Sequence, residues 1–145
     1  MKRYLPHLLA FAGLASCAPS TSHLPEGELG RQFTATVPGT WNEEIRRGSA
    51  IMNGEKTFHR DGSAHGSLSL KERGHGVSVV LPSITFRSKW RVEGDTYISY
   101  GVKSPMPGAF APGTIYRDRI LSVSPDKIVC RSEEQGRVFT MIRRR

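Results

Sequence analysis

Three histidines and one aspartate lie near one another in the middle of the chain and are the first residues that suggest chemistry. They are His59, Asp61, His65 and His75. Imidazole and carboxylate groups are ligands that zinc and copper accept. The spacing contains neither H-x-H nor H-E-x-x-H, and the glycines around it indicate turns. Depending on the length of the turn, His59 and His65 fall on the same face or on opposite faces of a hairpin. We expect surface histidines and no metal site.

No other group of residues matches a catalytic arrangement. The glycines at 74 and 76 lack the strand–loop–helix context of a phosphate-binding loop, and no serine lies in a G-x-S-x-G motif. The carboxylate pairs Glu43-Glu44 and Glu133-Glu134 are sequence neighbours, whose side chains point to opposite faces of a strand. We interpret them as solvent charges. The sequence therefore predicts no catalytic residues, no cofactor and no enzymatic activity.

Two tryptophans are the candidates for a ligand pocket. Trp41 and Trp90 both stand in strand-like segments. An aromatic side chain in such a position lines a pocket or anchors the core, where it buries a large apolar area. We favour a core position for both tryptophans.

Cys130, next to Val129, is expected to be a buried and inert thiol, with an intermolecular disulfide as the alternative.

The beginning of the chain has the order of features found in a secretory signal. Met1-Lys2-Arg3 is basic, Leu8–Leu14 is apolar, and Leu14-Ala15-Ser16-Cys17 follows. The apolar run is too short to span a bilayer. The segment Leu14–Cys17 resembles the lipobox of bacterial lipoproteins, in which the cysteine receives a diacylglycerol and becomes the first residue. The resemblance implies a signal peptide at 1–16 and a lipid attached to Cys17. Ala18 in place of aspartate resembles the members sorted to the outer membrane, so we expect a periplasm-facing outer-membrane protein.

The residues after Cys17 have the composition of a linker. Proline, serine, threonine and glycine predominate up to about Gly30, without periodicity. We predict a lipidated cysteine and tether at 17–30 and a folded domain at 31–145. A chain of 145 residues favours a single domain.

The predicted domain alternates with the period of β-strands. Ile84, Phe86, Trp90 and Val92 share one face of a segment whose other face is polar. Glu93-Gly94-Asp95 predicts a hairpin turn with a return strand over 96–103. Further turns are expected around Gly62, around 124–126 and around 134–136, with strands over 115–124, 127–132 and 137–143. The Pro- and Gly-rich stretch 104–113 suggests a mouth loop or a lid. Closely repeated strands and turns favour an all-β antiparallel meander that closes into a small barrel or half-barrel.

The motifs of this domain resemble those of the lipocalin-like (calycin) barrels. Gly39-Thr40-Trp41 corresponds to the G-x-W motif that opens the first strand, and the turns at Asp61-Gly62 and 121–126 also resemble small bacterial lipocalin-like lipoproteins. The resemblance implies a basic residue of the last strand, Arg143 or Arg137, packed over Trp41. The span from Gly39 to Arg143 is short for a barrel with a roomy cavity, since many small relatives fill the interior with side chains. The resemblance therefore supports a shared fold more than it supports shared ligand binding.

The positive charge of the chain indicates which binding partners to expect. The formal net charge is +8 at pH 7, with basic residues that include the run Arg143-Arg144-Arg145. Nucleic acid is an unexpected partner for an exported lipoprotein, whereas anionic lipid and cell-wall polymers are accessible to it. We expect the three arginines to contact such surfaces, with a solubilising face as the alternative. The favoured function is a non-enzymatic envelope lipoprotein with a binding module. The alternatives are a carrier of a small hydrophobic molecule and an inhibitor or accessory subunit of another envelope protein.

Overall fold

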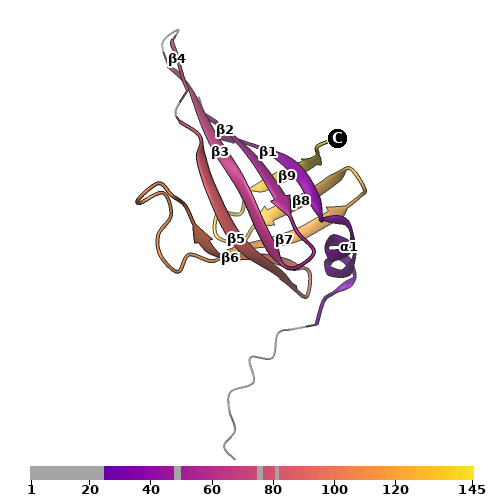
Figure 1. Cartoon of the computed structure of the whole chain (residues 1–145). Helices are drawn as coiled ribbons and strands as arrows, with labels where there is room; N and C mark the ends of the chain where they lie inside the picture. Colours follow the sequence, from indigo (N-terminus) through magenta and orange to yellow (C-terminus); the bar gives the residue numbers. More distant parts are fainter. Residues whose placement is uncertain (1–24, 48–49, 75–76, 81) are drawn as a thin grey trace, which may run out of the picture.

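The protein is a closed antiparallel β-barrel with one helix at its end (Figure 1). The structure, a computed structural model, describes residues 25–47, 50–74, 77–80 and 82–145. Helix α1 (Glu28–Thr36) precedes the strands. These are β1 (Gly39–Arg47), β2 (Ala50–Phe58), β3 (Ser63–Gly74), β4 (Val77–Val80), β5 (Ile84–Glu93), β6 (Thr96–Lys103), β7 (Tyr116–Val123), β8 (Lys127–Ser132) and β9 (Val138–Arg143). The predicted all-β meander is confirmed.

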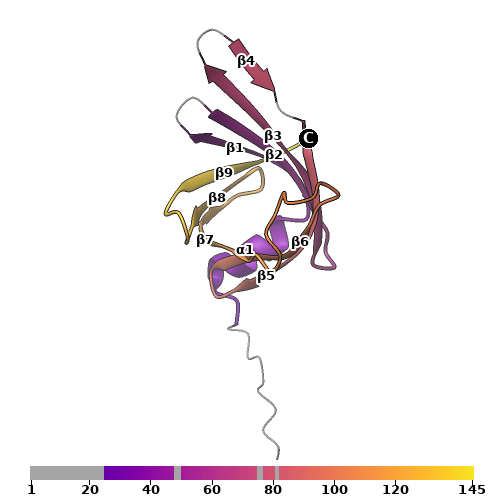
Figure 2. The same cartoon turned by 90° about the vertical axis from the view of Figure 1, so that its left-hand side faces the viewer.

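Eight of the strands close the barrel. The hydrogen-bonded order is β2-β1-β9-β8-β7-β6-β5-β3-β4, and β2 also pairs with β3, which joins the two sides of the sheet. Strand β4 pairs only with the far end of β3, so this hairpin projects beyond the barrel wall (Figure 2). Closure removes the exposed edges that an open sheet of this size would present. The closed barrel, not the half-barrel, is the observed form.

Alternation along β5 shows why these segments form a barrel wall. Phe86, Ser88, Trp90 and Val92 point inward, and the last three are buried, while the residues between them are more exposed. Successive side chains of a strand point to opposite sides, so one row fills the interior and the other meets water. The predicted alternation is therefore confirmed, with Ser88 on the inner row.

The predicted turns lie where they were expected. Residues 59–62 connect β2 to β3, and Gly62 has φ +83°, a conformation that glycine adopts without a steric penalty. Gly94 has φ +57° in the connection from β5 to β6. The two remaining predicted turns connect β7 to β8 and β8 to β9. These turns fix the register in which the inner rows meet.

Helix α1 closes one end of the barrel and was not predicted from the sequence. It packs against β7 and β5 and buries Phe33 and Val37 completely. The segment before it is also held, because Gly27 N donates to Gly94 O at 2.7 Å and Gly94 N donates to Pro25 O at 3.0 Å. The expected tether boundary at residue 30 therefore falls inside α1, and the folded domain includes residues from 25 onward.

The core lies between α1 and the middle of the barrel. Phe33 stacks on Tyr97 with ring centres 5.1 Å apart, and it meets the edges of Phe58 and Trp90 at 6.3 and 6.2 Å. Such offset and edge-to-face pairs stabilise a core beyond the area that they bury. This aromatic cluster seals the end of the barrel that α1 covers.

The expectations for the first residues of the chain concern a part that the structure does not describe. The predicted signal peptide at 1–16 and the lipid attachment at Cys17 lie outside the described residues. Within the residues that are described, no helix has the length and apolar character needed to cross a bilayer.

Candidate ligand-binding cavity

A cavity of about 380 Å³ occupies the end of the barrel opposite α1. It is lined by residues of all eight barrel strands and of the connections from β6 to β7 and from β8 to β9. Its apolar lining residues are Ile45, Met52, Phe58, Leu68, Phe86, Tyr97, Val102, Ala109, Phe110, Tyr116, Phe139 and Met141. The volume is within the range of small-molecule sites, although the domain was expected to be short for a roomy interior.

The connection between β6 and β7 covers part of the cavity mouth. Ala109 and Phe110 from this loop line the cavity, and the Phe110 ring meets the ring of Phe86 edge-on at 5.8 Å. Ser104 Oγ donates to Thr85 O at 2.7 Å and fastens the start of the loop to β5. The predicted mouth loop at 104–113 is therefore observed as part of the cavity wall.

Lys56 extends from β2 to the floor of the cavity. Its Nζ donates to Tyr97 Oη at 2.5 Å and to Ser99 Oγ at 3.2 Å. The ammonium also lies 5.0 Å from the ring centre of Phe58, 5.3 Å from Tyr97 and 5.7 Å from Phe86. These distances are within the range of cation–π attraction, so the charge is held by aromatic faces as well as by hydroxyls.

Two carboxylates share the interior with this lysine. Glu43 comes from β1 and Asp118 from β7, and both line the cavity. Asp118 is 9% exposed. Within the described part of the chain, neither carboxylate accepts a hydrogen bond or forms a direct ion pair. Their oxygens therefore line the cavity with free acceptor positions and keep some contact with solvent, which offsets part of the cost of burial.

Burial shifts the protonation equilibria of all three groups. It raises the pKa of Glu43 to about 7, with a further contribution from the negative charge of Asp118. It raises the pKa of Asp118 to about 6, against the attraction of Lys56. It lowers the pKa of Lys56 to about 8, against the two carboxylates. The three groups change charge between pH 6 and 8, as coupled groups in a low-dielectric site do.

Neither predicted tryptophan lines the cavity. Trp41 and Trp90 are 1% and 7% exposed and belong to the core. Trp41 Nε1 donates to Val37 O at 2.7 Å, and Trp90 Nε1 lies 3.1 Å from both His59 O and Ser63 O. Their polar atoms are thus satisfied by the ends of α1 and of the β2–β3 turn. The structure places both in the role that we favoured, as anchors of the fold.

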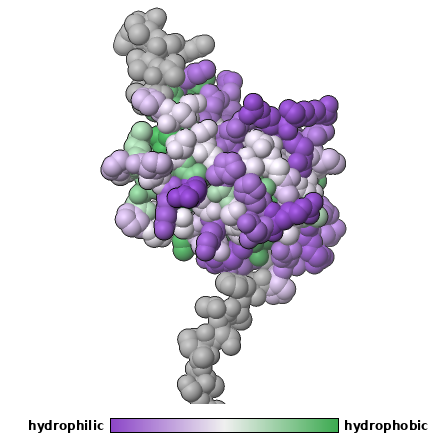
Figure 3. Space-filling view, viewed as in Figure 1, coloured by the Kyte–Doolittle hydropathy of each residue, from purple (hydrophilic) through white to green (hydrophobic). Residues whose placement is uncertain are grey.

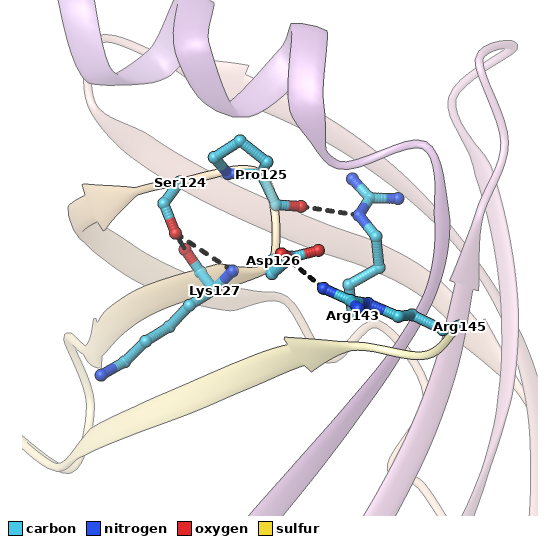
Figure 4. A network of polar contacts seen from close by, with 6 residues as sticks. All are labelled: Ser124, Pro125, Asp126, Lys127, Arg143 and Arg145. Carbon is cyan, nitrogen blue, oxygen red and sulfur yellow. Dashed lines mark hydrogen bonds and ion pairs between the residues drawn. The ribbon is translucent and has the colours of Figure 1, made fainter.

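Arg143 is the basic residue that packs over Trp41. Its guanidinium carbon lies 4.3 Å from the centre of the Trp41 ring, and the group donates to Pro125 O, Pro38 O and Thr36 O. Figure 4 shows the first of these bonds, at 2.7 Å. The choice between Arg143 and Arg137, which the sequence left open, is settled by this contact. Arg137 instead lines the cavity.

The other two arginines of the C-terminal run form ion pairs. Arg144 binds the carboxylate of Glu55, and Arg145 Nη2 lies 3.2 Å from Asp126 Oδ2 (Figure 4). All three guanidiniums thus have partners within the chain, although Arg144 and Arg145 are exposed and each uses one of its five N–H donors in these pairs.

The histidines come together in part. His59 Nε2 and His65 Nδ1 lie 3.0 Å apart with stacked rings, whereas His75 lies outside the described residues. Among the residues that the structure describes, no three His, Cys, Asp or Glu side chains gather closely enough to hold a metal ion.

Cys130 is fully buried, and burial raises the pKa of its thiol. The thiol is thus placed as an inert core group.

The cavity floor consists of residues that sequence reasoning missed. Glu43 was interpreted as a solvent charge, and this interpretation is wrong because it points inward while Glu44 is exposed. The usable signal was parity: Glu43 is two residues from Trp41, Lys56 two from Phe58, and Asp118 two from Ile120. In a strand, residues two apart share a face, so each charge lies in a core row.

The face of the molecule seen in Figure 3 is mainly hydrophilic, with apolar residues in small patches. The exposed large apolar side chains of the described chain are Met106, Ile115, Tyr116, Val138 and Ile142.

No protein-family model matches the sequence, and no curated protein matches it significantly. The cavity and its polar floor are therefore the features from which function can be argued.

Proposed function

We propose that the protein is a carrier or binding module that encloses one small molecule with an apolar body and a polar end. The observation that carries this proposal is the cavity of about 380 Å³, with apolar walls above a floor of Glu43, Lys56 and Asp118. Sites for small molecules typically combine apolar walls with a few polar groups that orient the ligand. The carrier hypothesis is now preferred over a barrel filled by its own side chains.

Two other functions have weaker support. A large exposed apolar patch would favour a docking module for another envelope protein, and the one face seen in Figure 3 has only small patches. Ionisable groups with shifted pKa values also occur in acid–base enzymes. Binding accounts better for this floor, because Lys56 is held by Tyr97 and Ser99 and the surrounding wall is largely apolar.

The proposed location of this carrier is the outer membrane, on its periplasmic side. The support is the sequence alone: the basic and apolar segments before Leu14-Ala15-Ser16-Cys17, and Ala18 after the cysteine. Two or more acyl chains on Cys17 would anchor the protein stably, at about 0.8 kcal/mol for each buried methylene. The barrel would then lie close to a source of small amphipathic molecules.

A role of Arg143, Arg144 and Arg145 at anionic lipid or cell-wall polymers is a secondary proposal. Arg143 is occupied by backbone carbonyls, and its neighbours pair with Glu55 and Asp126. These carboxylates offset part of the positive charge, so the expected attraction to an anionic surface is weaker than the run suggests, although Arg144 and Arg145 stay exposed. The lipid anchor and the cavity do not depend on it.

The carrier proposal is tested with a neutral apolar fluorophore, N-phenylnaphthylamine, added to the whole chain with Cys17→Ser. This substitution prevents acylation, so no detergent is needed. We expect saturable binding of one fluorophore per protein and its displacement by octanol. A linear increase in fluorescence without saturation would indicate surface partitioning and contradict the proposal.

A further inference from the structure

We propose that the cavity selects molecules whose polar end is a cation, such as an alkylammonium, over molecules that end in a carboxylate. This inference rests on the proposed function and names the chemical class of its ligand. It follows from which polar groups on the cavity floor already have partners and which do not.

The cation of the floor is already stabilised. Lys56 Nζ donates to Tyr97 and Ser99 and lies within 5.7 Å of three aromatic ring centres. A ligand carboxylate would have to compete with these contacts for the ammonium. It would also approach the carboxylates of Glu43 and Asp118, and like charges repel more strongly where burial lowers the effective dielectric constant.

The anions of the floor lack such support. Asp118 is about nine-tenths buried and lines the cavity from β7, and Glu43 lines it from β1, with β9 and β8 between the two strands. Neither has a hydrogen-bond donor within the described residues, which leaves two carboxylates lining one cavity. An ammonium group carries three donors and a positive charge, which complement a cavity lined by these two carboxylates.

The sum of charges around the cavity points the same way. The charged lining groups are the carboxylates of Glu43, Asp118 and Glu134 and the cations of Lys56 and Arg137. Three negative and two positive charges leave one negative charge when all are ionised. Glu133 adds to the negative potential at Asp118 from outside the lining. A monovalent cation would neutralise the site, whereas an anion would double its charge.

The number of protons exchanged on ligand binding gives a test that needs no substitution in the cavity. Glu43 and Asp118 have pKa values of about 7 and about 6, so near pH 7 they are partly protonated. A bound cation lowers both pKa values and expels protons. A bound anion raises them and takes protons up. The sign of the proton exchange therefore reports the charge of the head group that the floor accepts.

The test compares three probes that share an octyl chain: octylamine, octanol and octanoic acid. Each is titrated calorimetrically into the whole chain with Cys17→Ser near pH 7, in two buffers of different ionisation enthalpy. We expect octylamine to bind about tenfold more tightly than octanol, octanoate to bind most weakly, and octylamine binding to release protons.

Matched variants locate the effect. Glu43→Gln and Asp118→Asn should each weaken octylamine binding by about tenfold and leave octanol within about twofold. Glu44→Gln changes the neighbouring carboxylate, which faces outward, and should change neither affinity. Thermal melting identifies any variant that does not fold. In that case the decisive result is the proton release or uptake measured when octylamine binds the protein with Glu43 and Asp118 unchanged.

The outcomes separate the two proposals. Tighter binding of octanoate than of octylamine, or proton uptake with octylamine, would overturn cation selectivity while leaving the carrier function in place. Equal affinities of the three probes would do the same. Absence of saturable binding by all three would overturn the carrier function itself.

Discussion

Trp41 and Arg143 face each other across the seam between β1 and β9, and the guanidinium of Arg143 lies 4.3 Å from the centre of the Trp41 ring. The same guanidinium donates to the carbonyls of Thr36 at the end of α1, Pro38 just before β1 and Pro125 in the β7–β8 turn. One side chain thus joins the helix, the seam and a turn. Gly39 leaves room for it, because a Cβ there would lie 2.7 Å from Arg143 Nη1.

Replacement of Arg143 by alanine should destabilise the fold. The change removes the cation–π contact and three hydrogen bonds from a charged donor, with an expected loss of about 2–4 kcal/mol in the free energy of unfolding. Arg145→Ala is the matched control, since it removes an exposed ion pair with Asp126 and should change stability little. Urea unfolding measures both. Equal stability of the two variants would contradict the role assigned to Arg143.

Stability should fall as the pH rises from about 4 to about 7 because of Glu43 and Asp118. Their folded-state pKa values, about 7 and about 6, exceed the ordinary values of 4.5 and 3.8. The folded protein therefore keeps protons that the unfolded chain has lost, and this contribution is complete only below the ordinary values. The loss is on the order of a few kcal/mol.

The measurement is urea unfolding across this pH range for the parent protein and for the Glu43→Gln variant. Glutamine removes the titration, so the variant should be less sensitive to pH and the more stable of the two above pH 7. Glu44→Gln controls for the loss of a surface charge. A variant whose pH profile parallels that of the parent would show that Glu43 titrates as an exposed carboxylate.

Gly30→Ala should loosen α1 from the barrel. An added Cβ would lie 2.2 Å from Gly94 O and 2.8 Å from Val92 Cγ1, so the helix or the β5–β6 hairpin must shift. We expect a loss of about 1–3 kcal/mol, the usual effect of overpacking. Gln32→Ala, at an exposed position of the same helix, is the control and should be neutral. An equally stable Gly30→Ala protein would contradict the close docking of α1.

Acylation should depend on Cys17. A clickable fatty-acid analogue fed to cells that express the chain should label the parent protein, and Cys17→Ser should abolish the label. Cys130 is the other cysteine, and its burial makes Cys130→Ser a control that should keep the label. Labelling of Cys17→Ser at the parental level would exclude the lipobox interpretation.

The sequence was informative where local pattern and final environment agree. In β5 the alternation of apolar and polar residues marks the inner and outer rows, and the turns at Gly62 and Gly94 are local features of the chain. Helix α1 was missed because Gly27 and Gly30 resemble linker glycines. Both are needed because Asp95 and Gly94 approach them closely, which is a tertiary contact without a local signal.

The cavity floor was missed for a related reason. Glu43, Lys56 and Asp118 come from three strands, and each resembles a surface charge within its own segment. Only barrel closure brings them together. The arginine over Trp41 was narrowed to two candidates by family resemblance, and the register of β9 with β1 selects Arg143. Long-range register, not composition, decides these contacts.

The most direct test of the account is whether filling the cavity abolishes binding. Val102 lines the cavity and Val138 is exposed on β9, so Val102→Phe and Val138→Phe add the same atoms inside and outside the barrel. Binding of N-phenylnaphthylamine is measured by fluorescence for both, with thermal melting to verify folding. The account predicts that Val102→Phe weakens binding by about tenfold or more while Val138→Phe binds as the parent does. Unchanged binding by a folded Val102→Phe protein would contradict it.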